Sequence, residues 1–433
     1  MRFTAQFDRE RVWRRGNSVR HLVVRVSDNG ARQVRRAALN LAFVVDASGS
    51  MAGQPLQFAI EAAQRLADCL TDADRLSVVS FNSEVKDHLV CEAMTAQGRR
   101  RAQQALGALC ATGCTNLSGG WFRGAEHVAR LMERERASQN RVIVLSDGYA
   151  NEGIQAPSEL AAHAAELARR GLFSSTVGVG DDYHSETLEA IAVHGGGAHH
   201  RAARPAEIIE VVSGELDEIR GTAALGVSVG IRHAPGVRLK NLNEFPMRHE
   251  GEDSVCNLGS VASGASRTAV FRVKFPAGEP GTKCRFDIGA TWRQPGDDEI
   301  YSADPVCAAL IFSDSKDNNS QTPDLALTEE VAQVWQAYIV RRIVRLNREG
   351  RYSDAVRRLD RDLPLFTKYA EHAASGKTLI AELKRLRAAA SREWNEGNRK
   401  EVELVMHRRA YSRDDVRSAP PVAPAAWSDL MPE

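Results

Sequence analysis

Between about Leu39 and Arg220, short apolar runs alternate with amphipathic helical segments. The first run, LNLAFVVD (39–46), is apolar almost throughout, as expected of a strand buried on both faces of a sheet. The segment that follows, PLQFAIEAAQRLADCL (55–70), spaces its apolar residues as a helix does. This order repeats over roughly 180 residues and predicts an α/β fold with a doubly wound, mostly parallel sheet.

Three further strands are expected in this region. They are DRLSVVSFNSEV (74–85), NRVIVLSDG (140–148) and LFSSTVGVG (172–180), and helical segments separate them. Because the carboxyl ends of parallel strands meet at one edge of a sheet, the loops after these strands are the places to search for a ligand site.

The flanking segments have the period of two that is typical of antiparallel strands. Residues 222–314 read as a β-sandwich, and two strands at 2–13 and 19–29 would complete it. We therefore predict that an α/β domain, 38–221, is inserted in or joined to a β-sandwich made of 1–37 and 222–314.

A polar linker is expected at 313–324, followed by a helical domain at 325–415. Thr328 is the expected N-cap of the first helix, and separate helices are expected at 353–362 and 365–374. The last residues, 416–433, are rich in Pro and Ala and predict a disordered tail.

Composition excludes several classes of protein. A formal net charge of +1 gives no overall bias toward nucleic acid or anionic membranes. No apolar run approaches a membrane span, and the opening residues lack the apolar core of a signal peptide. The seven cysteines, scattered without a pairing pattern, indicate reduced thiols. We expect a cytoplasmic protein with no membrane segment.

Oxygen-bearing side chains follow three of the expected strands. Asp46, Ser48 and Ser50 lie in FVVDASGSM, Thr115 in TGCTNL and Asp147 in VLSDGYAN. Hydroxyls and carboxylates, with no His or Cys among them, are the ligands of a hard cation such as Mg²⁺, Mn²⁺ or Ca²⁺. The sequence therefore predicts a divalent-metal site.

These motifs resemble those of von Willebrand factor A domains. FVVDASGSM matches their D-x-S-x-S signature, and a Thr and an Asp on later loops complete their metal-ion-dependent adhesion site. Thr115 and Asp147 follow in that order, and the resemblance covers residues 38–220. TVGVGDDYHSETLEAIAVHGGG is similar to the bacterial branch of the family, which is related to inter-alpha-trypsin-inhibitor heavy chains and calcium-activated chloride channel regulators. One departure is Cys114, where many members have a second Gly before the Thr.

The resemblance implies a function as well as a fold. Ser48, Ser50 and Thr115 would hold the cation directly, and Asp46 and Asp147 directly or through water. Neutral hydroxyl ligands leave the cation able to bind an Asp or Glu of a partner protein. We therefore expect a non-enzymatic, Mg²⁺-dependent (or Mn²⁺- or Ca²⁺-dependent) interaction module, a scaffold or adaptor in an intracellular bacterial-type regulatory or stress complex. Intracellular relatives often work with MoxR-type AAA+ ATPases or with a phosphatase–kinase pair, so the resemblance implies these as expected partners.

Several motifs in the chain also fit simpler interpretations. The Asp46–Ser48–Ser50 cluster resembles a helix N-cap, and a serine-rich loop before a helix also suits phosphate. SGKT (375–378) imitates a P-loop, but Glu371 stands where the first Gly is required. The histidines of HGGGAHH (194–200) lack the spacing of a zinc site, and no nucleophile elbow is present.

The alternative function of a different class is a nucleic-acid-linked effector that uses the helical domain. Residues 325–417 hold 20 Lys and Arg against 14 Asp and Glu. Acidic residues are interspersed among these arginines, which favours a solvated helix face over a nucleic-acid surface.

Overall fold

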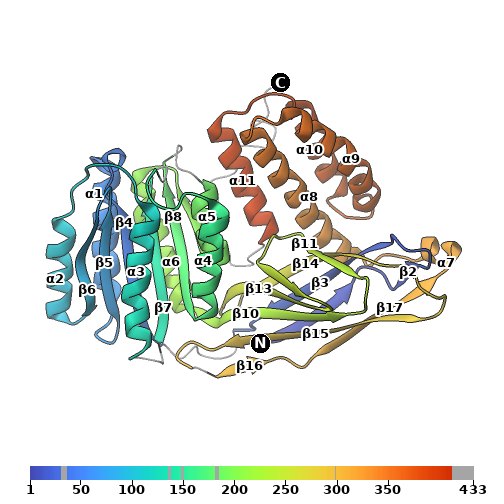
Figure 1. Cartoon of the computed structure of the whole chain (residues 1–433), viewed down its shortest axis with the longest axis horizontal. Coiled ribbons are helices and arrows are strands. Elements are labelled where there is room, and N and C mark those ends of the chain that lie inside the picture. Colours follow the sequence, from blue (N-terminus) through green and yellow to red (C-terminus); the bar gives the residue numbers. More distant parts are fainter. Residues whose placement is uncertain (31–36, 135–137, 148–150, 181–184, 298, 412–433) are drawn as a thin grey trace.

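The computed structural model describes residues 1–30, 37–134, 138–147, 151–180, 185–297 and 299–411. Figure 1 shows an α/β layer on the left, a region of long strands at the lower right and a group of helices above those strands. The predicted tail, 416–433, lies outside the described residues.

The α/β layer is built on a six-stranded sheet in the order β6-β5-β4-β7-β8-β9. Neighbouring strands are parallel except for the edge pair β5–β6. This confirms the predicted doubly wound sheet. The strands are β4 (Ala38–Asp46), β5 (Arg75–Phe81), β6 (Val85–Ala93), β7 (Ser138–Ser146), β8 (Leu172–Val179) and β9 (Gly196–Ala202).

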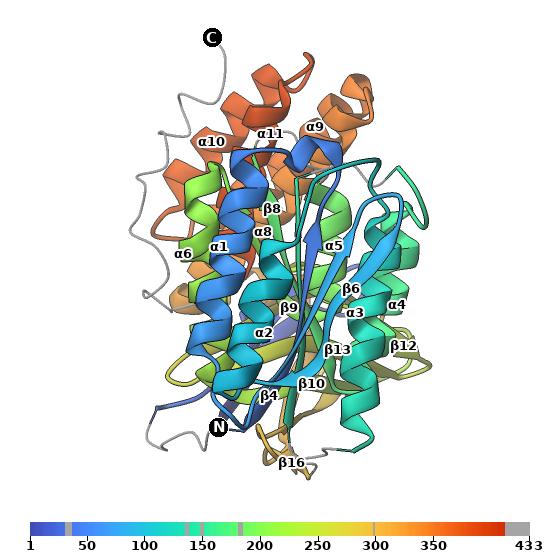
Figure 2. The ribbon, with the colours of Figure 1, turned by 90° about the vertical axis from the view of Figure 1, so that its left-hand side faces the viewer.

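Helices cover both faces of this sheet, as Figure 2 shows. One face is covered by α1 (Gln54–Cys69), α2 (Ala96–Gly107) and α6 (Ile208–Arg220). The other is covered by α3 (Leu117–Met132), α4 (Pro157–Arg169) and α5 (Ser185–His194). Short 3-10 helices precede α1 and α6 at η1 (Gly49–Met51) and η2 (Pro205–Glu207). A separate apolar cluster fills the space on each side, which explains the near-continuous burial of the central strands.

The single strand expected at 74–85 is wrong, because the chain reverses direction within it. Asn82 N donates to Glu84 O at 2.9 Å, and Glu84 N donates to the Asn82 side chain at 2.8 Å. This tight turn returns the chain as β6, which pairs with β5 in the antiparallel sense. Because β6 is an edge strand with polar, half-exposed residues, its sequence lacks the apolar character of the central strands.

Two further sheets form the β region. One has the order β1-β3-β14-β11, with β1 (Arg2–Phe7), β3 (Val19–Ser27), β14 (Ser266–Lys274) and β11 (Arg238–Asn241). The other has the order β12-β13-β10-β15-β17-β2, and β16 (Ile300–Ser302) pairs with β15. Its strands are β12 (Met247–Glu250), β13 (Asp253–Ala262), β10 (Thr222–His233), β15 (Lys283–Arg293), β17 (Val306–Ser313) and β2 (Arg11–Trp13).

The N-terminal segment contributes to both of these sheets. The one strand expected at 2–13 is two strands, β1 and β2, which lie in different sheets. β2 runs parallel to β17, so the region is not purely antiparallel. β3 and β2 thus pair with β14 and β17, strands that lie beyond the α/β layer and more than 200 residues later in the sequence.

The C-terminal helices are α7 (Ser315–Ser320), α8 (Leu325–Arg348), α9 (Tyr352–Ala370), α10 (Gly376–Ala389) and α11 (Glu396–Ala410). Three expectations fail here. The linker contains α7. Asp324, rather than Thr328, caps α8 by accepting from Leu327 N at 3.0 Å. The two helices expected around Pro364 are one helix, α9, since Pro364 is exposed and water can satisfy the carbonyl that a proline leaves free.

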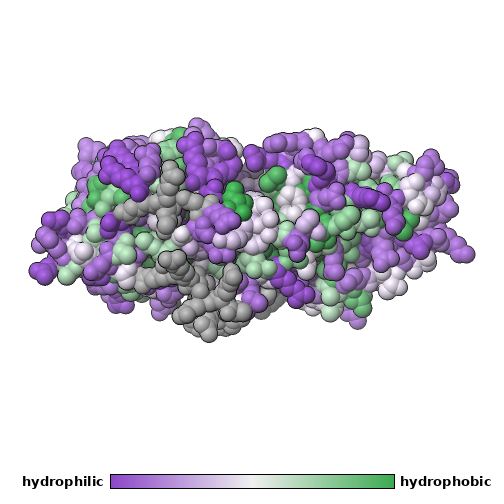
Figure 3. Space-filling model, turned by 90° about the horizontal axis from the view of Figure 1, so that it is seen from below, coloured by the Kyte–Doolittle hydropathy of each residue, from purple (hydrophilic) through white to green (hydrophobic). Residues whose placement is uncertain are grey.

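The face of the molecule seen from below is largely polar (Figure 3). Seen from below, hydrophilic side chains cover most of the described surface, with apolar patches between them (Figure 3). Among the described residues, no helix combines the length and the apolar character needed to cross a membrane.

A buried polar cluster joins the β region to α9. Asp8 accepts from His21 N at 2.8 Å and from the Tyr369 hydroxyl at 2.9 Å, and the His21 ring lies 3.2 Å from the same carboxylate. Burial alone would raise the pKa of Asp8, but the bonds and charge of His21 and the Tyr369 hydroxyl hold that pKa below its usual value. Asp8 therefore stays ionised in the interior and anchors α9 to the sheet.

We expect Tyr369→Phe to lower the free energy of unfolding by about 1.5–3 kcal/mol, because it removes a hydrogen bond to a buried charged acceptor. Urea unfolding followed by circular dichroism measures this loss. Tyr352→Phe, at the start of the same helix, is the matched control and should change stability by less than about 0.5 kcal/mol. Equal effects of the two substitutions would contradict the anchoring role.

Salt bridges hold α5 of the α/β layer against the C-terminal helices. Arg341 of α8 lies 3.3 Å from Glu189, and Arg348 lies 2.8 Å from Glu186. Arg348 also pairs with Glu403 of α11 at 3.1 Å. Burial alone would raise the pKa of Glu189, but Arg341 and His407 hold it well below the usual value. This contact fixes α5 relative to α8.

Glu189→Gln should cost about 1–3 kcal/mol of stability at pH 7. A carboxyl whose pKa is lower in the folded chain stabilises it above the unfolded pKa of roughly 4.3 and loses that contribution as the pH falls. The difference between wild type and variant should therefore narrow below about pH 4. Urea titrations at several pH values test this, with the exposed Glu210→Gln as the control. A pH-independent difference would contradict it.

Candidate metal centre

Three loops meet at the carboxyl edge of the six-stranded sheet. β4 pairs in parallel with β5 on one side and β7 on the other, and Val45 lies opposite Leu145. Asp46, the last residue of β4, and Asp147, the first residue after β7, therefore lie at the ends of neighbouring strands. Backbone hydrogen bonds from Gly49 N to Gly113 O, at 3.1 Å, and from Thr112 N to Ala47 O, at 2.8 Å, tie the third loop to the first.

A chain of short contacts joins four of the five predicted ligands. Asp46 accepts from Ser48 N at 2.9 Å, and the Ser48 and Ser50 hydroxyls lie 3.0 Å apart. The Ser50 hydroxyl donates to Asp147 at 2.9 Å. Asp46 and Ser48 are buried, whereas Ser50 is exposed. The side chains thus gather at one point that opens to solvent on the side of Ser50.

The helix-capping interpretation of these serines does not fit their contacts. Ser48 precedes η1, but its side chain makes no capping hydrogen bond. α1 begins after Gly53 and likewise has no side-chain cap. Because the serine oxygens face each other and a carboxylate instead of helix N–H groups, they remain available as ligands.

Thr115 is brought to the same edge by contacts of its backbone. Its N–H donates to the Asn151 side chain at 2.8 Å, and its carbonyl accepts from Asn151 N at 3.1 Å and Glu152 N at 3.2 Å. Asn116 then caps α3 by accepting from Gly119 N. The buried Thr115 hydroxyl has no protein hydrogen-bond partner among the described residues, so it too is free to bind a ligand.

Two residues that support the site were not foreseen. The Ser146 hydroxyl donates to Asp46 at 2.5 Å, and Asn151 holds the Thr115 loop. Ser146 could have been found, since it ends the strand beside β4. Asn151 could not, because its contact depends on how the loop after Asp147 folds.

The departure at Cys114 has a simple structural explanation. Gly113 has φ of +73°, which favours glycine, and an added Cβ would lie 3.1 Å from the Ser83 hydroxyl. The Cys114 side chain is exposed, and only its N–H makes a contact, to Ser83 at 3.0 Å. The turn therefore requires glycine at 113 but not at 114.

Electrostatics at this edge favour a cation. Burial, with the charge of Asp46, raises the pKa of Asp147 to about 6 although Ser50 donates to it. Burial also raises the pKa of Asp46 despite its bonds from Ser146 and Ser48. Two carboxylates and three hydroxyls form a hard, oxygen-only donor set, which fits Mg²⁺, Mn²⁺ or Ca²⁺.

The other candidate motifs do not form sites. The His199 ring contacts the Thr176 hydroxyl at 2.8 Å, and the His200 ring contacts Glu215 at 2.6 Å. The described residues contain no cluster of three or more His, Cys, Asp or Glu that could hold a metal. SGKT lies where α10 begins and follows a helix, so it lacks the strand of a P-loop.

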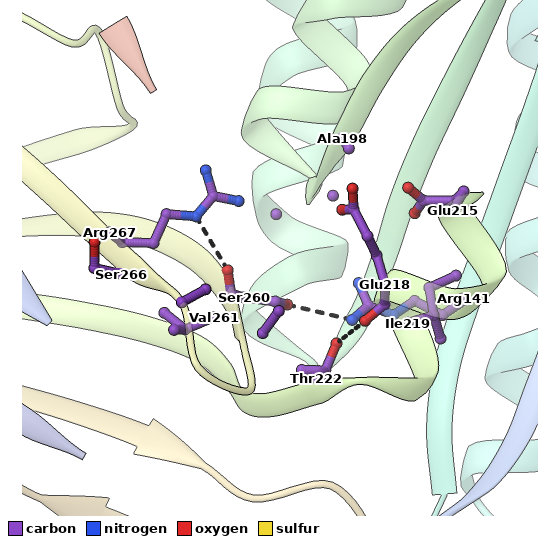
Figure 4. Close-up of a pocket in the computed structure, with 14 residues that line it drawn as sticks. Arg141, Ala198, Glu215, Glu218, Ile219, Thr222, Ser260, Val261, Ser266 and Arg267 are labelled. Carbon is purple, nitrogen blue, oxygen red and sulfur yellow. Dashed lines mark hydrogen bonds between the residues drawn. The ribbon is translucent and has the colours of Figure 1, made fainter. Parts of the chain in front are cut away.

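A small pocket lies where the α/β layer meets the β13–β14 hairpin (Figure 4). Arg141 donates to the Ser260 hydroxyl at 3.3 Å across this junction, and Arg267 donates to the Ser260 carbonyl at 3.2 Å. Its volume of about 30 Å³ suits a single water molecule. The pocket is therefore a packing feature.

Comparison with known proteins identifies the α/β layer. Residues 40–211 match the model of the von Willebrand factor type A domain family. Inter-alpha-trypsin inhibitor heavy chain H3 of Pongo abelii is 28% identical over 196 residues, which are 44% of this chain and 22% of the relative. An uncharacterized protein of Synechocystis sp. is 33% identical over 193 residues, 44% of each chain. The matches thus span less than half of either relative.

Two solved structures resemble nearly the whole chain in fold. A von Willebrand factor type A protein from Catenulispora acidiphila has a TM-score of 0.69 at 17% identity and covers 93% of this chain and 96% of its own. The ArnB paralog VWA2 from Sulfolobus acidocaldarius has a TM-score of 0.60 at 16% identity and covers 95% and 98%. The α/β layer, the strand region and the helices therefore recur together. Residues 40–211 of this chain form a von Willebrand factor type A domain.

Proposed function

We propose that this protein binds a partner protein through a divalent cation held by Asp46, Ser48, Ser50, Thr115 and Asp147. Domains of this family are commonly metal-dependent protein–protein interaction modules. A cation at this edge would supply an open coordination position for an Asp or Glu of the partner. The function is binding, and we assign no catalytic residue.

One observation carries the proposal: the serine oxygens make no capping bonds and face each other and Asp147. Both oxygens of Asp46 already accept hydrogen bonds, from Ser48 N and the Ser146 hydroxyl. Asp46 is thus suited to act through water and to orient the serine loop. Ser48, Ser50 and Thr115 are the direct ligands in this proposal, and Mg²⁺ is the preferred ion.

The chemistry of the site describes the partner in general terms. We propose an intracellular protein of a regulatory or stress complex that presents an exposed acid, and an AAA+ ATPase of the MoxR type or a phosphatase–kinase pair fits that role. The nucleic-acid alternative has less support. Many arginines of the helical part pair with carboxylates, as in Arg358–Asp362, at 2.6 Å, and Arg387–Asp360, at 2.8 Å. Such pairing reduces the charge available to phosphates.

Mg²⁺ should stabilise the protein, and Asp147→Asn should abolish that effect. At free Mg²⁺ near one hundred times Kd, linkage gives about 2.7 kcal/mol of stabilisation. In EDTA the variant should be as stable as wild type or more stable, because a carboxylate near Asp46 is removed. Thermal unfolding with EDTA or Mg²⁺ tests both points.

Asp217→Asn, an exposed change on α6, is the control and should keep the full response to Mg²⁺. A wild-type protein whose melting temperature is the same in EDTA and in saturating Mg²⁺, Mn²⁺ and Ca²⁺ would refute the metal site.

Partner capture should depend on both the metal and Ser48. The amount of partner retained by the immobilised full chain in Mg²⁺ should fall by about tenfold or more in EDTA or with Ser48→Ala. A tenfold loss of affinity corresponds to only about 1.4 kcal/mol of binding free energy. Ser213→Ala, an exposed serine on α6, should leave capture unchanged. Replacing the contacting acid of the recovered partner by its amide should have the same effect as EDTA. If retention is unchanged by EDTA, by Ser48→Ala and by the amide substitution in the partner, a metal-bridged contact is excluded.

A further inference from the structure

A second cavity lies at the edge of the sheet opposite the metal centre. It is lined by the amino-terminal parts of β7 and β8, the end of α4 and the strands β10 and β15 of the β region. Its volume of about 390 Å³ falls within the range of roughly 300–1,000 Å³ that holds small organic ligands. It lies between two layers of the fold, which is a common place for such sites.

One side of this cavity carries positive charge from both layers. Arg169 and Arg170 end α4 and share a single acid, Glu166. Arg293 reaches from β15, and an added Cβ at Gly171 would lie 3.4 Å from its guanidinium. The backbone of Arg293 pairs within the sheet, but its side chain forms no hydrogen bond or ion pair among the described residues. A guanidinium without a partner is well suited to bind a carboxylate or phosphate in bidentate fashion.

The acidic groups nearby do not neutralise Arg293. Asp297 also lines the cavity, but its carboxylate accepts from the Tyr301 hydroxyl at 2.6 Å and from Glu299 N at 2.9 Å. Glu166 is already shared between two arginines. Among the described residues, the cavity wall therefore offers three guanidinium groups against one engaged carboxylate.

The cavity lining also includes two aromatic residues, one of which has an unsatisfied donor. Phe173 and Trp292 are both buried and line the cavity. The Trp292 indole N–H is buried without a hydrogen-bond partner. A buried donor left without an acceptor costs roughly 1–3 kcal/mol, so a ligand oxygen that accepted from it would recover that cost.

We propose that this cavity binds a small organic anion with a flat apolar body and one carboxylate or phosphate. The anionic group would pair with Arg293, near Arg169 and Arg170. The apolar body would lie against Trp292 and Phe173, with an acceptor atom toward the indole N–H. Such a ligand would contact the α/β layer and the β region together. This site is independent of the metal centre.

Calorimetric titration of the full chain in EDTA tests this proposal, because EDTA removes any binding through a divalent cation. The probes are indole-3-acetate for a carboxylate, phenyl phosphate for a phosphate, and indole-3-acetamide as the uncharged match of the first. We expect saturable binding of one or both anions, and at least about tenfold weaker binding of the amide. Binding of only one anion would identify which group the site takes.

Two variants locate the binding. Arg293→Gln should lower the affinity for the anion by about tenfold or more. Trp292→Phe, which keeps an aromatic ring but loses the N–H, should lower that affinity several-fold. Arg285→Gln, an exposed position on the same strand, should have no effect. The proposal would be overturned if neither anion bound saturably or if the amide bound as tightly as the carboxylate. It would also be overturned if Arg293→Gln left the affinity for the anion unchanged.

Discussion

The parallel pairing of β4 with β5 and β7 is the constraint on which the candidate metal centre depends. It places the ends of two strands side by side, so that Asp46 and Asp147 lie at the same edge of the sheet. Backbone bonds then tie the Thr115 loop both to the turn after β4 and to the turn after β7. The ligands are separated by about a hundred positions in the sequence, yet their relative placement follows from the sheet and a few backbone contacts.

The β region and the C-terminal helices share one hydrophobic core. The largest apolar cluster contains Val24 and Phe271 of one sheet, Ile288 of the other, and Ile343 and Leu383 of the helices. The Asp8–His21–Tyr369 contact lies within the same junction. The separate sandwich and helical domains predicted at 222–314 and 325–415 stay predictions, but this packing indicates that neither part buries its core alone.

The success of sequence-based prediction followed the strength of the local signal. Central strands such as 39–46 are apolar on both faces, so the sequence identifies them as strands, although it does not predict β9 or the order of strands in the sheet. Failures occurred where burial was one-sided or where a local contact decided the result. The edge strand β6 is polar. Asp324, rather than Thr328, caps α8 because the chain enters the helix there. The exposed Pro364 is tolerated within α9. The five candidate ligands could be named from motif order, whereas Ser146 and Asn151 required tertiary structure.

The candidate site at the carboxyl edge of the sheet combines two carboxylates with neutral hydroxyls, and its charge explains this choice of residue types. Asp46 is buried and holds the serine loop through Ser48 N, while Asp147 receives the Ser50 hydroxyl at the exposed side. If carboxylates replaced the serines, their added negative charge would repel an incoming acid and raise the cost of burying the metal-free site. Hydroxyls provide oxygen ligands without that charge. In the proposed function, the exposed side beside Ser50 and Asp147 is where a partner's carboxylate would reach the bound cation.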